Sequence, residues 1–182
     1  MNLSRRKLGL VASVATMAAA MMAGGSTVAQ ASSASAGSVK PFAGVFNPIR
    51  NVGDNLCLQP VSPVLNSPVV QEPCDGSAMQ GWESAGDYRG YQYINQASGL
   101  CLNAFIGAEN GAPFGLDTCR EVSNEWFANA LLPNVTQVQS LIGWGKTGFC
   151  MDVPGASGAP GLQMQLWTCN GTLAQRWVIG FS

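Results

Sequence analysis

The six cysteines of this 182-residue chain constrain its fold more than any other feature. They fall into three pairs with gaps of 17, 18 and 19 residues, and the first members of the pairs are 44 and then 49 residues apart. A unit that recurs at a nearly fixed period indicates a repeat architecture. The pairs are Cys57 and Cys74, Cys101 and Cys119, and Cys150 and Cys169.

The residues around the cysteines repeat as well. Each unit has a short apolar stretch around its first cysteine, a turn-rich segment, a second apolar stretch that leads to the second cysteine, and a tryptophan seven or eight residues later: Trp82, Trp126 and Trp177. The chain holds 22 Gly and 10 Pro, which favours turns and short strands over long helices. We therefore predict an all-β domain over 45–182, with repeats at about 45–86, 87–132 and 133–182.

Six cysteines allow 15 disulfide pairings in principle. Repetition selects the pairing within each unit, and closing loops of this size stabilises a fold by roughly 3 kcal/mol each on the chain-entropy model. The alternative is a thiolate metal cluster, but the paired C-x-x-C segments typical of zinc sites are absent from the sequence. We predict no metal and no cofactor.

The N-terminal residues have the composition of an export signal. Arg5, Arg6 and Lys7 precede an apolar run from Leu8 to about Ala23, and small residues then lead to 34–36, Ala-Ser-Ala. We predict a signal peptide at 1–36, a tether at 37–44, and a secreted, extracellular protein that does not associate with a membrane after cleavage. An uncleaved anchor is the alternative, and the sequence leaves the Sec and twin-arginine routes both open.

Composition excludes several functions. The sequence has no histidine, which excludes Ser-His-Asp and Cys-His catalysis and histidine-ligated metals. Nine basic residues less the three of the signal leave six against ten acidic residues, a net charge of −4, which argues against nucleic acid as a partner. The acidic pair Glu121 and Glu125 is the best remaining catalytic candidate, but it lies in a turn, so we predict no catalytic residues and no enzyme.

Three repeats of about 45 residues that each end near a Q-x-W motif resemble the ricin B-type lectins and carbohydrate-binding modules. The motif is intact at 80–82 and 175–177, and the middle copy is assigned to Asn124-Glu125-Trp126. The resemblance covers roughly 45–182. It implies a β-trefoil of six two-stranded hairpins, with the tryptophan of each motif in the core.

Strand alternation singles out one exposed aromatic side chain. In the third unit Leu162, Met164 and Leu166 share one face of a strand, so that Trp167 lies on the polar face with its ring free to stack. Counting back from the second cysteine places Asp117 and Glu72 at this position in the other units, and a carboxylate cannot offer a flat apolar surface to a sugar. The third unit is therefore the candidate for binding.

The resemblance implies which residues would hold a sugar. The family uses an Asp after the first cysteine, a Gln and an aromatic on the facing strand, and an Asn-Gln pair that opens the Q-x-W motif. Asp152, Gln165, Trp167 and Gln175 match, whereas the Asn position is Ala174. Asn170, just after the second cysteine of the unit, is the candidate for supplying the missing amide.

These residues predict a weak carbohydrate-binding protein. The resemblance implies a neutral glycan or polysaccharide as the partner, with galactose- or xylose-type sugars first. One shallow site predicts a dissociation constant of roughly 0.1–1 mM. The alternative is a β-trefoil that binds a protein, as a toxin subunit or an inhibitor, with degenerate sugar sites.

Overall fold

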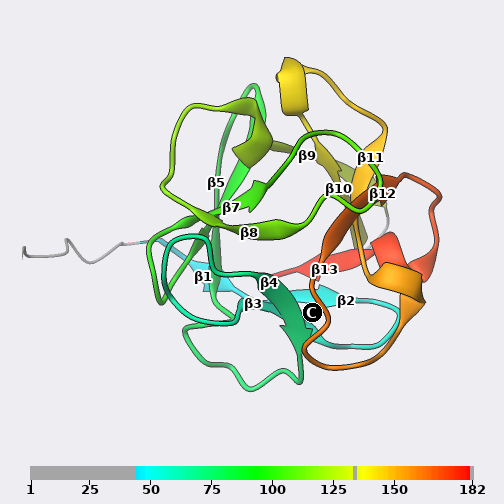
Figure 1. Cartoon of the computed structure of the whole chain (residues 1–182). Coiled ribbons are helices and arrows are strands. Elements are labelled where there is room, and N and C mark those ends of the chain that lie inside the picture. Colours follow the sequence, from blue (N-terminus) through cyan, green and yellow to red (C-terminus); the bar gives the residue numbers. More distant parts are fainter. Residues whose placement is uncertain (1–43, 133–134, 181–182) are drawn as a thin grey trace, which may run out of the picture. The chain divides into compact units, whose positions relative to one another are not determined.

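The computed structural model describes residues 44–132 and 135–180. Within these ranges the chain forms thirteen strands and four short 3-10 helices (Figure 1). The predicted signal peptide at 1–36 and all but the last residue of the predicted tether lie outside the described residues.

Each repeat contributes four strands of three to six residues. The first holds β2 (Ile49–Asn51), β3 (Cys57–Pro60), β4 (Val69–Glu72) and β5 (Trp82–Asp87), and the second holds β6 (Gly90–Asn95), β7 (Cys101–Ala104), β8 (Phe114–Asp117) and β9 (Phe127–Leu132). The third holds β10 (Val135–Ser140), β11 (Phe149–Asp152), β12 (Gln165–Thr168) and β13 (Trp177–Ile179). Four strands in each of three units confirm the predicted β-trefoil.

The outer strands of the repeats form a six-stranded barrel. β5 pairs with β6 and β9 with β10 as hairpins that join neighbouring repeats, and β13 pairs with β2, which joins the third repeat to the first. The barrel closes through β1 (Phe46–Asn47), which pairs with β5 and is separated from β2 by Pro48 alone. Proline lacks a backbone N–H, which accounts for the break in the ladder at this point.

The inner strands of each repeat form a second set of hairpins, β3–β4, β7–β8 and β11–β12. Figure 1 shows these hairpins around a common centre in teal, green and orange. Isolated bridges link each hairpin to the other two: Pro68 to Gly115, Val70 to Gln163, and Pro113 to Gln165. Three barrel strand pairs and three cap hairpins together give the six two-stranded units predicted from the sequence.

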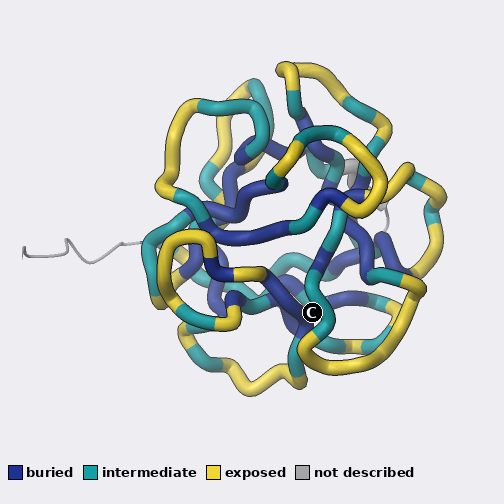
Figure 2. Tube along the Cα trace, viewed as in Figure 1, coloured by how far each residue is buried: buried dark blue, intermediate teal, exposed yellow. Residues whose placement is uncertain are grey.

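The core lies between the barrel and the cap. Figure 2 shows buried residues along the strands and exposed residues at the tips of the loops. Alternating positions of the strands supply the buried side chains, which pack around Trp82, Tyr93, Phe114, Phe127 and Trp177. The sequence contains few charged residues, and the core cluster has none.

The sequence assignment of the middle motif is wrong by one residue. Glu125 occupies the position of Gln80 and Gln175, because each accepts the backbone N–H of the residue five positions earlier. The core aromatic is consequently Phe127, which is fully buried in the central cluster. Trp126 lies outside that cluster, and its ring packs under the Arg89 guanidinium, whose carbon is 4.3 Å from the ring centroid.

The spacing from the second cysteine of each repeat gives the correct position of the core aromatic residue. Trp82, Phe127 and Trp177 each lie eight residues after their cysteine, and they pair with strands β1, β6 and β10, respectively, at the start of each repeat. The middle motif is therefore Glu125-Trp126-Phe127. The prediction from the sequence was one residue off because Trp126, next to Phe127, has the residue type found in the other two repeats.

All three predicted disulfides are present. They join Cys57 to Cys74, Cys101 to Cys119, and Cys150 to Cys169, with Cα–Cα distances of 5.1, 4.9 and 5.0 Å. Each links the first cap strand of a repeat to the residue shortly after its second cap strand. The disulfides therefore hold the ends of each cap hairpin together.

Candidate functional site

The candidate site lies on the third cap hairpin, β11–β12. Asp152 at the end of β11 pairs directly with Gln165 at the start of β12, and Trp167 follows two residues later on the same face. These three side chains line one surface pocket of about 560 Å³. The structure therefore brings together the acid, the amide and the aromatic that the sequence singled out.

Trp167 has an exposed ring because of strand alternation. Leu166 and Met164 on the opposite face are fully buried in the core, whereas Trp167 is 40 % exposed. Its neighbour Thr168 donates its backbone N–H to the side-chain oxygen of Asn110, at 2.7 Å, which ties this end of β12 to a loop of the second repeat. The ring is thus presented to solvent from an anchored strand.

Asp152 is a nearly buried acid that faces the pocket, and it is 5 % exposed. Burial raises the pKa of its carboxyl to about 6, and the neighbouring Gln175 amide acts in the opposite direction. That amide donates to the carbonyl oxygen of Thr168 at 3.0 Å, and no donor within residues 44–132 and 135–180 makes a well-formed hydrogen bond to the carboxylate. Asp152 is therefore an acceptor available to a ligand.

A short 3-10 helix, η3 (Pro154–Ala156), forms one wall of the pocket. Gly155 and Ala156 have positive φ angles of 61° and 51°, a conformation that glycine adopts easily and alanine rarely. This wall was not predicted from the sequence. The Pro-Gly pair two residues after Asp152 is a turn signal that could have located it.

Asn170 and Gln175 have different roles in the structure. Asn170 lines the pocket, and its side-chain oxygen accepts the N–H and the hydroxyl of Thr172, so that its amide NH₂ is the group left to face a ligand. Gln175 is fully buried and does not line the pocket. It accepts the Asn170 N–H at 2.8 Å and holds the Asn170 loop in place.

The position before the Q-x-W glutamine differs among the three repeats. It is Met79 in the first, Asn124 in the second and Ala174 in the third, and each lies five residues after the second cysteine of its repeat. In the second repeat the Asn124 amide donates to the side-chain oxygen of Asn103 at 2.9 Å. Because Asn103 corresponds to Asp152, Ala174 leaves this acid without the donor that an asparagine would supply.

The corresponding sites of the other repeats are filled by the protein's own polar contacts. In the second repeat Asn103 donates to Asp117 and Glu125, and Arg120 forms an ion pair with Asp117. In the first repeat the Gln80 amide donates to the side-chain oxygen of Gln59 at 2.9 Å. Among the described residues, the third repeat alone combines at these positions an exposed aromatic with an acid that forms no ion pair.

The acidic pair singled out in the sequence does not flank a cleft. Glu121 is exposed and pairs with Arg89, whereas Glu125 is fully buried and accepts the Arg120 N–H. Burial raises the pKa of Glu125. In the part of the chain that the structure describes, no cluster of three or more acidic or cysteine side chains could hold a metal ion.

No helix among the described residues is long and apolar enough to span a membrane.

Comparison with known proteins agrees with the fold. The ricin-type beta-trefoil lectin domain model matches residues 45–177. "Serine protease 1" of Rarobacter faecitabidus is 33 % identical over 86 residues, which are 47 % of this chain and 16 % of that protein. The chain therefore corresponds to a small part of the length of that relative.

Solved structures share the fold at low sequence identity. The designed threefold-symmetric protein ThreeFoil has a TM-score of 0.70 and 17 % identity, with 75 % of this chain and 99 % of that protein covered. The Macrolepiota procera ricin B-like lectin, solved with lactose, has a TM-score of 0.65 and 16 % identity, with 76 % and 96 % covered. Because the family model spans most of the chain, this protein belongs to the ricin-type beta-trefoil lectin domain family, a non-catalytic carbohydrate-binding fold.

Proposed function

We propose that this protein is secreted and binds a neutral glycan weakly through one site in its third repeat, built around Asp152 and Trp167. The observation that supports this most is their position in a single pocket: an exposed indole ring beside a nearly buried carboxylate that forms no ion pair among the described residues. A sugar can satisfy both groups, since its C–H face stacks on an aromatic ring and its hydroxyl groups donate to an acid. Galactose- and xylose-type sugars are the first candidates.

The other lining residues complete this chemistry. Gln165 lies across the strand pair from Asp152, and the Asn170 amide borders the same pocket, so that donors and acceptors surround the aromatic surface. The Macrolepiota procera lectin was solved with lactose, which contains galactose. One small site with a single stacking ring supports a dissociation constant of about 0.1–1 mM.

The experiment is a titration of the purified protein with galactose, lactose, xylose and xylobiose, followed by tryptophan fluorescence and by NMR. Trp167→Ala removes the stacking surface and is expected to abolish binding. Trp144→Ala is the matched control, since that ring is 51 % exposed on a different loop and its loss should leave binding intact. Undiminished sugar binding by Trp167→Ala would show that the site lies elsewhere.

Secretion is supported by the export-type composition of the N-terminal residues and by the three disulfides, which persist in oxidising compartments. The test is N-terminal sequencing of the protein recovered from the culture medium of the source organism. A mature protein that starts near residue 37 is expected, and full-length protein retained in the cell would contradict the proposal.

The absence of catalysis is part of the proposal. Glycosidic cleavage requires two carboxyl groups that flank one cleft, and Asp152 is the one acid among the residues that line the pocket. Prolonged incubation with galactan and xylan is expected to release no reducing sugar. Release that depends on Asp152 would overturn this part of the proposal.

An exposed aromatic cluster favours a second candidate function, the binding of a protein. The Arg89 guanidinium lies 5.7 Å from the ring centroid of Trp144 and 5.8 Å from that of Tyr88, and Tyr88 is 95 % exposed. Exposed aromatic and arginine side chains are enriched in protein interfaces. A glycan array and a pull-down from the native secretome separate the candidates, because capture of a protein that free sugar does not compete away favours the second.

A further inference from the structure

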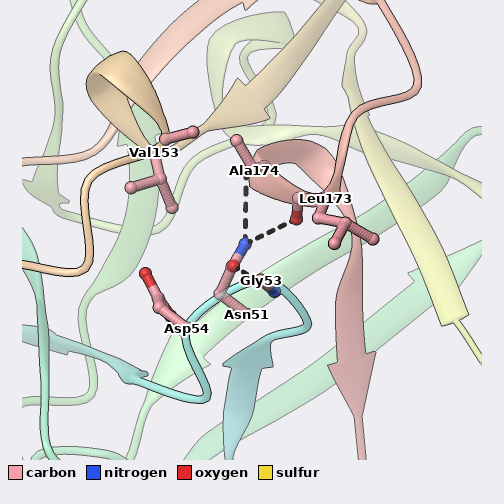
Figure 3. Close-up of a pocket in the computed structure, with 7 residues that line it drawn as sticks. Asn51, Gly53, Asp54, Val153, Leu173 and Ala174 are labelled. Carbon is pink, nitrogen blue, oxygen red and sulfur yellow. Dashed lines mark hydrogen bonds between the residues drawn. The ribbon is translucent and has the colours of Figure 1, made fainter.

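A second hollow borders the Trp167 pocket and belongs to two repeats. It has a volume of about 170 Å³ and lies between the turn at 51–54 of the first repeat and the helices η3 and η4 (Leu173–Gln175) of the third (Figure 3). Ala156 and Ala174 line both the hollow and the Trp167 pocket. The two spaces therefore share a wall.

The hollow has a polar group on one side and apolar groups on the other. Asp54 points toward Val153 across the hollow, as Figure 3 shows, and one of its carboxylate oxygens accepts the N–H of Leu56 at 2.9 Å. The second oxygen has no hydrogen-bond partner among the described residues. Leu173, 52 % exposed, and Val153 supply apolar surface opposite the acid.

Asn51 forms a wall of the hollow rather than a ligand group. Its side-chain amide donates to the backbone carbonyl oxygens of Leu173 and Ala174 at 3.3 and 3.2 Å, and its oxygen accepts the Gly53 N–H at 2.7 Å (Figure 3). These bonds fix the turn of the first repeat against η4 of the third. The hollow is thus preformed, with Asp54 as its free acceptor.

The short side chain of Ala174 lies between the hollow and the Trp167 pocket. The other repeats carry Met79 and Asn124 at this position, and Asn124 reaches across to the residue that matches Asp152. Either of those longer side chains at position 174 would occupy the wall that the two spaces share. Alanine at position 174, where the family motif has asparagine, therefore leaves only a short side chain between the two spaces.

We propose that the Asp54 hollow is a second subsite, which accepts the neighbouring unit of a neutral oligosaccharide whose first unit stacks on Trp167. This inference rests on the proposed function, since the first unit occupies the Asp152 pocket. The hollow has the volume of about six water molecules, which is comparable to one pyranose unit. Carboxylates at both subsites select against uronic, sialic and sulfated sugars.

Titrations with galactose and lactose, and with xylose, xylobiose and xylotriose, test this inference. In the unmodified protein the best disaccharide is expected to bind at least tenfold more tightly than its monosaccharide. Asp54→Asn keeps the oxygen that accepts the Leu56 N–H and removes the charged acceptor. The gain in affinity from monosaccharide to disaccharide is therefore expected to fall below about threefold, while the affinity for the monosaccharide stays unchanged. Equal gains in the variant and the unmodified protein would overturn the inference.

Ala174→Met provides a second variant that uses the residue of the first repeat at the matching position, where the fold already accommodates it. It is expected to reduce the gain in affinity from monosaccharide to disaccharide as Asp54→Asn does, and a retained tenfold gain would show that the second sugar unit does not cross the wall at position 174. The outcomes separate the two proposals. If the unmodified protein binds no sugar, the proposed function itself fails, whereas equal affinity for mono- and disaccharides overturns only the second subsite.

Discussion

Asp152→Asn is expected to make the protein more stable at neutral pH while it removes sugar binding. The carboxyl has a pKa of about 6 in the folded protein, raised from 3.8 by burial, so folding disfavours its charged form. Asparagine has nearly the same shape as the protonated acid and does not titrate. The substitution therefore removes the cost of burying the charge.

The size and sign follow from proton linkage. Below pH 3.8 both the folded and the unfolded chains hold the proton, and Asp152 contributes no pH dependence. As the pH rises from 3.8 to about 6, the unfolded chain loses the proton first, and the free energy of unfolding falls by about 1.4 kcal/mol per pH unit. Above this range the loss is complete and amounts to at most about 3 kcal/mol.

The assay is urea unfolding of both proteins with intact disulfides, followed by fluorescence at pH 3, 5 and 8. The two proteins are expected to be equally stable near pH 3, and the variant to be more stable at pH 8 by up to about 3 kcal/mol, or roughly 10 °C in Tm. Glu109→Gln makes the same charge change at an exposed position and should alter stability by less than about 0.5 kcal/mol. A variant less stable than the parent at every pH would refute the reasoning, because Asp152 would then be a structural acceptor.

Three further predictions concern binding, the core and the disulfides. Sugar affinity is expected to fall by up to about tenfold per pH unit as the pH drops below about 6, because protonation of Asp152 removes the charged acceptor; constant affinity from pH 4 to 8, measured by titration, would contradict this. Phe127→Ala is expected to cost about 3–5 kcal/mol in urea unfolding, whereas Trp126→Phe, which keeps an aromatic ring beside Arg89, should cost far less; a smaller cost for Phe127→Ala than for Trp126→Phe would contradict this. Replacing Cys150 and Cys169 together by serine is expected to lower the free energy of unfolding by about 3 kcal/mol, and an unchanged urea midpoint would argue against the disulfide's contribution.

The sequence predicted the fold and the disulfides because both depend on a unit that repeats. The cysteine spacing marked the three units, and the pairing within each unit needed only the short distance across one cap hairpin. Strand alternation placed Trp167 on the outer face, since successive side chains point to opposite sides of a strand. These features are local, and local patterns can be recognised in a sequence.

The middle motif shows where a local pattern was insufficient. Tryptophan identity favoured Trp126, but hydrogen bonding of Glu125 and strand pairing place Phe127 in the core. The spacing from Cys119 agreed with the structure, so geometry was the better guide than residue type. A phenylalanine fills the same core position because the requirement is a large apolar ring.

The sequence alone determined the β-trefoil, the three disulfides and the exposed tryptophan of the third repeat. Only the tertiary structure decided that Asp152 is nearly buried at the pocket, that Gln175 lies outside the pocket lining, and that Asp54 borders a neighbouring hollow. The physical reason is that these properties depend on residues far apart in the chain: Asn51 and Ala174, which join the walls of the hollow, are 123 positions apart. Repeats reveal how each unit folds, whereas the surfaces between units form only when the barrel closes.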